Sequence, residues 1–257
     1  MPKLDLTTAK QIKGPWGEAR RLKGPGYAWA KFDPLGAYYG VGLGQIPLRL
    51  DPLDVVMDGA NVASIPNLGG AGAAFDATSN GTTPITRSNG LLNFTATAQA
   101  RLAMPADFFG VRLFAVVQRP SQPSSFSTVL RSATSGEGNG DFRLDEDGSA
   151  RLRYRAYKQQ SSANVYATSA YTPVRTDLHL VEFEMLSNGT AYCAVNGVSI
   201  AVTVQGISPP LPVQILGGAL ISMGEAISVI TDGSSTVNPT IDAVRNHLAA
   251  KYGITIT

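Results

Sequence analysis

Residues 178–204, LHLVEFEMLSNGTAYCAVNGVSIAVTV, decide the fold class of this chain. Within residues 181–185 apolar residues alternate with two glutamates, and residues 191–195 and 198–204 also alternate. Successive side chains of a strand point to opposite faces of a sheet, so each segment predicts a half-buried strand. Asn196-Gly197 favours a two-residue type I′ turn, because both residues tolerate positive φ. The stretch therefore predicts a three-stranded antiparallel meander.

Further strands and one helix are predicted on either side of the meander. Residues 111–118 form an apolar, β-rich run, and two strand-like segments within residues 142–156 flank Asp147-Gly148, a hairpin signal. A helical pattern begins with Asn238 as N-cap and Pro239 at the first helical position, and it ends at Gly253. Its apolar face is formed by Ile241, Val244, Leu248 and Tyr252.

The composition agrees with a β-sandwich and excludes several other classes. Of 257 residues, 16% are charged and 44% hydrophobic, and there are 27 glycines and 16 prolines. A disordered chain would have fewer apolar residues, and a coiled coil would have more Glu, Lys and Arg. We therefore expect a mostly β fold, a two-sheet antiparallel sandwich with a short C-terminal helix. The single cysteine, Cys193, excludes an internal disulfide, and the apolar window 213–230 is too interrupted to predict a membrane span.

Residues 1–50, here called the arm, differ from the rest of the chain. Residues 1–31 hold seven Lys or Arg against two acidic residues, whereas the remainder holds 14 basic and 17 acidic residues. The arm repeats Lys-Gly-Pro at residues 13–15 and 23–25, contains both tryptophans and shows no sustained period. We expect an extended arm that docks on another protein; a flexible tail is the alternative, and the spread of its charges does not favour nucleic acid. The expected docking residues are Lys13, Trp16, Arg20, Arg21, Lys23, Tyr27 and Trp29.

The order of the segments after the arm resembles the concanavalin A-like (laminin-G-like) jelly roll. The resemblance rests on the apolar strand 113–117, the Asp-Gly and Asn-Gly hairpins, residues 57–70, and the terminal Leu-Ala-Ala-Lys-Tyr-Gly-Ile at 248–254. It covers about residues 52–257, and we assign residues 51–257 to this domain. The resemblance implies a lectin-like sandwich.

An arm joined to such a domain resembles spike and fibre proteins of tailed phages and of gene-transfer particles. The resemblance implies a virion protein, assembled in the bacterial cytoplasm, that docks on capsid or tail proteins through the arm and binds a cell-surface glycan. We expect a homo-oligomer, because several copies convert weak sugar contacts into avidity. A purely structural capsid or tail decoration protein and a polysaccharide-degrading glycoside hydrolase are the alternatives.

Two sets of residues are candidates for binding sugar. Arginines at alternate positions of one strand could match the anionic groups of a glycan, although Glu182, Glu184, Asp141 or Asp145 could instead neutralise them across strands. A Tyr-, Gln- and Asn-rich segment, expected to be a polar loop, offers the aromatic surfaces and amide hydrogen bonds that sugars require, although its tyrosines could simply anchor the loop. The candidate residues are Arg151, Arg153, Arg155, Tyr157, Gln159, Asn164, Tyr166 and Tyr171.

The remaining chemistry does not indicate catalysis or a cofactor. Glu182 and Glu184 share a strand face at a tolerable spacing for glycoside hydrolysis, but Val-Glu-Phe-Glu-Met lacks the further carboxylates of the family's hydrolases. We interpret both as solvated and expect that the protein is not an enzyme. The acidic segments 137–141 and 145–148 could offer oxygen ligands to calcium, but hairpin turns explain them and we expect no metal. Of the two histidines, we expect His179 half-buried and His247 exposed.

Overall fold

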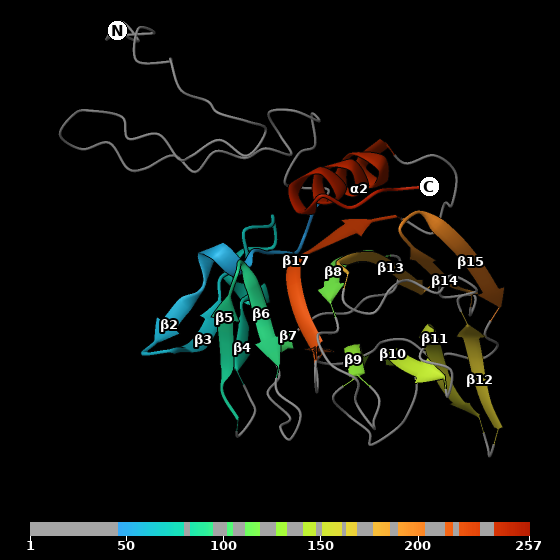
Figure 1. Cartoon of the computed structure of the whole chain (residues 1–257), viewed down its shortest axis with the longest axis horizontal. Coiled ribbons are helices and arrows are strands. Elements are labelled where there is room, and N and C mark those ends of the chain that lie inside the picture. Colours follow the sequence, from blue (N-terminus) through green and yellow to red (C-terminus); the bar gives the residue numbers. More distant parts are fainter. Residues whose placement is uncertain are drawn as a thin grey trace, which may run out of the picture.

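The computed structural model describes residues 46–79, 83–94, 102–104, 111–118, 127–132, 141–147, 151–160, 163–168, 177–185, 190–203, 214–217, 221–231 and 239–257. The described fold is mostly β, antiparallel, with one C-terminal helix (Figure 1). This confirms the predicted fold class. The docking residues of the arm, Asn238 and Tyr171 lie outside the described residues.

The first sheet holds the strands that the sequence predicted best. Its order is β15 (Val198–Thr203), β14 (Thr190–Val195), β13 (His179–Met185), β8 (Val111–Gln118) and β17 (Ile221–Ile230). The far side of β17 pairs with β1 (Arg49–Leu50) and with β6 (Leu91–Phe94). The predicted meander is β13–β14–β15, and its second turn has the predicted type I′ geometry, with φ of 49° at Asn196 and 87° at Gly197.

The second sheet runs from β4 (Ala77–Ser79) through β7 (Leu102–Met104), β16 (Gln214–Leu216), β9 (Ser127–Ser132) and β10 (Asp141–Asp147) to β11 (Arg151–Gln160) and β12 (Ala163–Thr168). It is joined to the first sheet because β3 (Asn61–Ile65) pairs with β4 and also with β5 (Ile85–Ser88), which pairs with β6. Strand β2 (Val56–Asp58) pairs with β3, and short 3-10 helices lie at Pro52–Asp54 and Gly72–Phe75.

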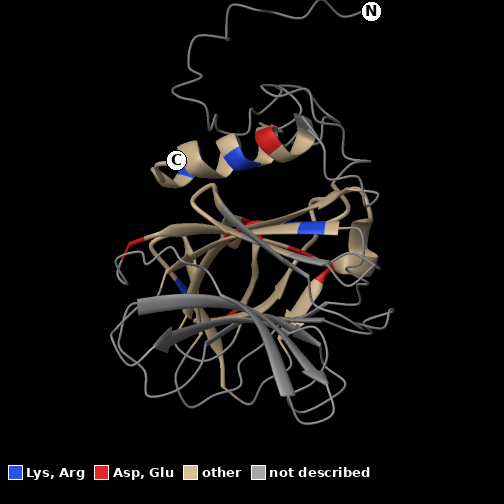
Figure 2. Ribbon diagram, turned by 90° about the vertical axis from the view of Figure 1, so that its right-hand side faces the viewer, with Lys and Arg blue, Asp and Glu red and all other residues tan. Residues whose placement is uncertain are grey.

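Helix α2 (Pro239–Tyr252) packs on the outer face of the first sheet (Figure 2). Ile241, Val244 and Leu248 contact a cluster that includes Phe114 of β8 and Leu180 of β13. These are the apolar positions that the sequence predicted for the helix face. Pro239 begins the helix and Gly253, with φ of 67°, follows its last turn, as predicted.

Both faces of the central strands are buried. Even-numbered residues of β8 such as Phe114 and Val116 belong to the cluster with α2, whereas Leu113, Ala115 and Val117 point to the other side of the sheet and are 0–1% exposed. Burial on both faces explains why β8 is a nearly continuous apolar run rather than an alternating one.

The packed core begins before residue 51. Ile46 and Leu48 are at most 1% exposed, and Ser228 N donates to Leu48 O at 2.9 Å while Leu48 N donates to Ser228 Oγ at 3.0 Å. The arm was predicted to extend to residue 50, but its last residues pack along β17.

The prediction for His247 was wrong. His247 is fully buried, because its side chain lies on the helix face that packs on the sheet. His179 is 1% exposed rather than half-buried, since β13 is covered on both faces. Among the described helices, none is both long and apolar enough to cross a membrane.

Candidate functional site

Four of the five predicted Tyr, Gln and Asn sugar-binding residues share one face of the β11–β12 hairpin. The register pairs Tyr157 with Tyr166 and Gln159 with Asn164. Residues directly opposite in an antiparallel pair lie on the same face, as do alternate residues of one strand. These residues were expected in a polar loop, but β11 continues to Gln160 and β12 begins at Ala163, so they occupy two paired strands.

The three predicted arginines lie on that same face, farther along β11. Their partners on β10 are Asp147 for Arg151, Asp145 for Arg153 and Arg143 for Arg155. Asp145 therefore opposes an arginine, as one of the alternatives required, whereas Asp141 opposes Tyr157. We call this surface the polar face; its residues are Asp141, Arg143, Asp145, Asp147, Arg151, Arg153, Arg155, Tyr157, Gln159, Asn164, Tyr166 and Thr168.

The opposite face of the same three strands holds their aliphatic residues, together with Glu146, Lys158 and Gln160. Register places Phe142 with Ala156, Leu144 with Tyr154, and Ala167 with Ala156. An apolar face is the one a sandwich turns toward its core, and a polar face is the one left to solvent. From this sequence pattern we expect the polar face on the outer side of the second sheet.

Glu182 and Glu184, the carboxylate pair considered for hydrolysis, lie under helix α2. They are 0% and 4% exposed, so the expectation that they are solvated was wrong. Arg245 of α2 binds Glu182 with two hydrogen bonds of 2.7 and 2.9 Å, and Arg112 of β8 binds Glu184 at 2.6 Å. The hydrogen bonds with Glu182 raise the pKa of Arg245 above its already high ordinary value.

These ion pairs also decide whether Glu182 and Glu184 neutralise the arginines of β11. Glu182 and Glu184 neutralise Arg112 and Arg245 rather than the arginines of β11, so that proposed cross-strand neutralisation was wrong. Hydrogen bonds between a guanidinium group and a carboxylate are charge-assisted and strongly directional. The arrangement ties α2 to β8 and β13.

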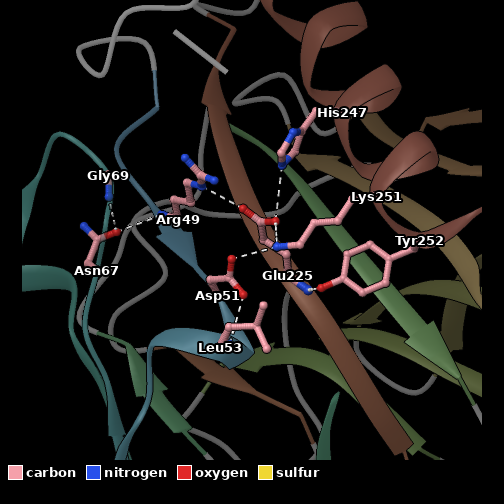
Figure 3. Close-up of polar contacts among 9 residues, drawn as sticks. All are labelled: Arg49, Asp51, Leu53, Asn67, Gly69, Glu225, His247, Lys251 and Tyr252. Atoms are coloured by element: carbon pink, nitrogen blue, oxygen red, sulfur yellow. Dashed lines mark hydrogen bonds and ion pairs between the residues drawn. The ribbon is translucent and has the colours of Figure 1, made fainter. Parts of the chain in front are cut away.

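A second buried carboxylate, Glu225 of β17, joins three segments distant in sequence (Figure 3). Its Oε1 lies 2.6 Å from Arg49 Nε of β1, and its Oε2 lies 2.6 Å from Lys251 Nζ and 3.3 Å from His247 Nε2, both of α2. Lys251 also binds Asp51 Oδ2 at 2.7 Å. Helix α2 therefore contacts the first sheet through His247 and Lys251, which bind Glu225, as well as through its apolar residues.

The charges around Glu225 decide its protonation. Burial would raise the pKa of this carboxyl, but the hydrogen bond with His247 and the charges of Lys251 and Arg49 outweigh it and hold the pKa far below the ordinary 4.5. Burial lowers the pKa of Lys251, but Glu225 and Asp51 outweigh it and raise that pKa overall. Burial and these two carboxylates raise the pKa of Tyr252, whose hydroxyl accepts a hydrogen bond from Glu225 N at 2.8 Å.

Sequence reasoning missed the Glu225 cluster, although one signal for it was present. Glu225 is the single charged residue in the run Ile221–Ile230, and a lone carboxylate in such a run needs buried cationic partners. His247 and Lys251, four residues apart on a helix, were the matching pair. In the described part of the chain, His, Cys, Asp and Glu do not gather into a group of three or more that could hold a metal ion.

No protein-family model and no curated protein sequence matches the chain. Solved structures do match its fold. Trypanosoma rangeli sialidase is 14% identical with a TM-score of 0.59, over 83% of this chain and 34% of the sialidase. The binding domain of botulinum neurotoxin DC in complex with SialylT is 9% identical with a TM-score of 0.55, over 80% of this chain and 52% of that one. The same domain in complex with rat synaptotagmin II matches equally well, with a TM-score of 0.55.

These similarities show the fold, and the chain spans only a third to a half of the matched proteins' length. They also correct one prediction. The expectation that the protein is not an enzyme, drawn from the missing carboxylates, is contradicted, because a structural neighbour with this fold is a sialidase. The fold therefore gives no ground for excluding catalysis.

Proposed function

We propose that this protein binds carbohydrate through the polar face of β10, β11 and β12. The observation that carries the proposal is the register, which brings Tyr157, Tyr166, Gln159 and Asn164 onto adjacent positions of one face. A sugar has apolar C–H surfaces that stack on aromatic rings and hydroxyls that bond to amides. Two opposed tyrosines followed by an opposed Gln–Asn pair offer both within one sugar-sized area.

The structural neighbours support a glycan as the ligand class. A botulinum neurotoxin binding domain with this sandwich fold has been solved in complex with SialylT. The likeness is one of fold, so the residues that would contact sugar here are argued from this chain's own strands. Neither Arg245 nor Arg112 contributes to the site, because Glu182 and Glu184 hold both on the other sheet.

A glycan array tests the proposal. The full chain is labelled and applied beside three variants: Tyr157→Ala, Tyr166→Ala and, as a matched control, Tyr192→Ala, a tyrosine that lies against Arg112 on β14. Loss of an aromatic anchor costs about 2 kcal/mol or more, so each polar-face variant should bind roughly thirtyfold or more weakly than wild type. Binding by none of the proteins, or equal binding by wild type and both polar-face variants, would contradict the proposal. Released sugar is measured in the same wells, because the fold also occurs in a sialidase.

The arm, residues 1–50, has a separate proposed role in attachment. Its support is the sequence of residues 1–50, with seven Lys or Arg among residues 1–31 and both tryptophans of the chain. We propose that the arm fixes several copies to a capsid or tail protein of a phage-like virion, so that weak sugar contacts add up to avidity. The test compares incorporation of the full chain with a Trp16→Ala/Trp29→Ala variant into purified particles. Equal incorporation of the two proteins would overturn the docking step.

A further inference from the structure

The register of the polar face leaves one arginine pair without an opposing acid. Arg151 and Arg153 each face an aspartate on β10, but Arg155 faces Arg143. On the outer sides of that pair the register places Thr128 of β9 beside Arg143 and Thr168 of β12 beside Arg155. A row Thr–Arg–Arg–Thr therefore crosses four neighbouring strands.

Two like charges directly opposite each other destabilise a sheet, because Cβ atoms in such a pair are only about 4.5–5.5 Å apart. Two acidic positions lie two residues from Arg143 on β10: Asp145, which faces Arg153, and Asp141, which faces Tyr157. Because Asp145 already opposes Arg153, Asp141 is the acidic position left for two arginines. The polar face carries four arginines and three aspartates, so its excess positive charge lies at the Arg143–Arg155 row.

Two arginines at directly opposed positions of neighbouring strands suit one anionic group bound between them. Guanidinium presents parallel N–H donors that match the oxygens of a carboxylate or a sulfate, and the hydrogen bonds are charge-assisted. The flanking threonines add hydroxyl groups at both ends of the row. The next row along the strands, at roughly 6.5–7 Å, is the Tyr157–Tyr166 pair.

We propose that the Arg143–Arg155 row is a subsite for the anionic group of an acidic sugar, whose ring lies toward Tyr157 and Tyr166. This inference rests on the proposed carbohydrate binding and names its ligand class: a glycan that carries a carboxylate or sulfate. Bound anion relieves the repulsion between the two arginines. The acidic sugar is therefore preferred over its neutral counterpart.

Three matched probes test the subsite: lactose, 3′-sialyllactose and 3′-sulfolactose. Affinities of the full chain are measured by isothermal titration at low and physiological salt. Wild type should bind one or both acidic probes at least tenfold more tightly than lactose, and the preferred probe identifies carboxylate or sulfate as the ligand. The Arg143→Gln/Arg155→Gln variant should lose that preference and keep its affinity for lactose.

The Arg151→Gln/Arg153→Gln variant is the control, because it removes the same charge from arginines that face aspartates. It should keep most of the preference for the acidic probe, and an equal loss in both variants would overturn the subsite in favour of a general field effect. Thermal melts give a second readout: without ligand, Arg143→Gln/Arg155→Gln should unfold no earlier than wild type, and earlier unfolding would show a structural role instead. Wild-type binding of glycans without an acidic preference would refute this inference alone, whereas no glycan binding at all would refute the proposed function.

Discussion

Replacing Glu225 by Gln tests whether buried charges hold helix α2 on the first sheet. The carboxylate is fully buried and lies within 2.6 Å of both Arg49 Nε and Lys251 Nζ (Figure 3). The substitution preserves shape but removes the anion that Arg49 and Lys251 share, although Lys251 keeps its contact with Asp51. Breaking a buried ion pair in this way costs about 3–5 kcal/mol.

The expected change is large enough to measure directly. For a domain of this size about 1 kcal/mol shifts Tm by roughly 2–4 °C, so Glu225→Gln should lower Tm by about 6–20 °C. Calorimetry of the full chain gives Tm, and urea unfolding at pH 7 gives the free energy difference.

A surface ion pair on the same helix provides the control. Asp242 binds Arg245 at 2.6 Å, but its side chain is 59% exposed, so Asp242→Asn should cost less than about 1 kcal/mol. If Glu225→Gln were no more destabilising than Asp242→Asn, the reasoning about the buried cluster would be refuted.

Three further predictions concern stability. The pKa of Glu225 is depressed in the folded state and returns to its ordinary 4.5 on unfolding, so the stability it contributes is fully present above that pH and is lost progressively as pH falls below 4.5 toward the folded-state pKa. Urea titrations from pH 7 to pH 3 should show the difference in unfolding free energy between wild type and Glu225→Gln narrowing below about pH 4.5, and a constant difference would contradict the assignment. Gly217 and Gly90 both have positive φ, 79° and 74°, but a Cβ at Gly217 would clash with the Phe94 ring, whereas a Cβ at Gly90 would meet nothing within 4 Å. Replacing Gly90 by Ala should lower the free energy of unfolding by about 1–2 kcal/mol, and replacing Gly217 by Ala should lower it by at least about 1 kcal/mol more. Equal losses at the two positions would show that the Phe94 ring moves aside. Asn196 Oδ1 accepts the hydrogen bond of a buried backbone N–H in β13 at 2.9 Å, so Asn196→Ala should cost about 1–3 kcal/mol in the same urea assay, and an unchanged midpoint would show that another acceptor replaces it.

The sequence predicted elements wherever a strand has one clear period or a turn has a fixed chemistry. The meander β13–β14–β15 and its Asn196-Gly197 turn were found because a type I′ turn selects those two residues. Helix α2 was found because its apolar spacing, Pro239 and Gly253 agree. These signals are local in the sequence, so they can be recognised without the tertiary structure.

The wrong predictions of solvent exposure came from assigning an outer face. Glu182 and Glu184 alternate with apolar residues as solvated strand residues do, but α2 covers that face of the sheet and supplies Arg245 as a partner. His247 was expected on the exposed side of the helix, but it is fully buried. A single sequence shows which residues share a face, but it does not show that a helix more than 50 residues away will cover it.

The candidate site, too, could be predicted only in part from the sequence. Composition selected Tyr157, Gln159, Asn164 and Tyr166, but only the register of β11 and β12 shows that they share a face. The Arg143–Arg155 row depends on the register of β10 with β11, because a shift of one residue would place Arg143 against an apolar position.

Hydrogen exchange of the full chain with and without a bound glycan from the array tests the central claim most directly. The account predicts that glycan slows exchange of backbone amides in residues 151–160 and 163–168, the strands that carry the polar face. It predicts no change in β8, β13 or α2, which lie on the other sheet or outside it. Protection confined to those elements, with none in β11 and β12, would contradict it.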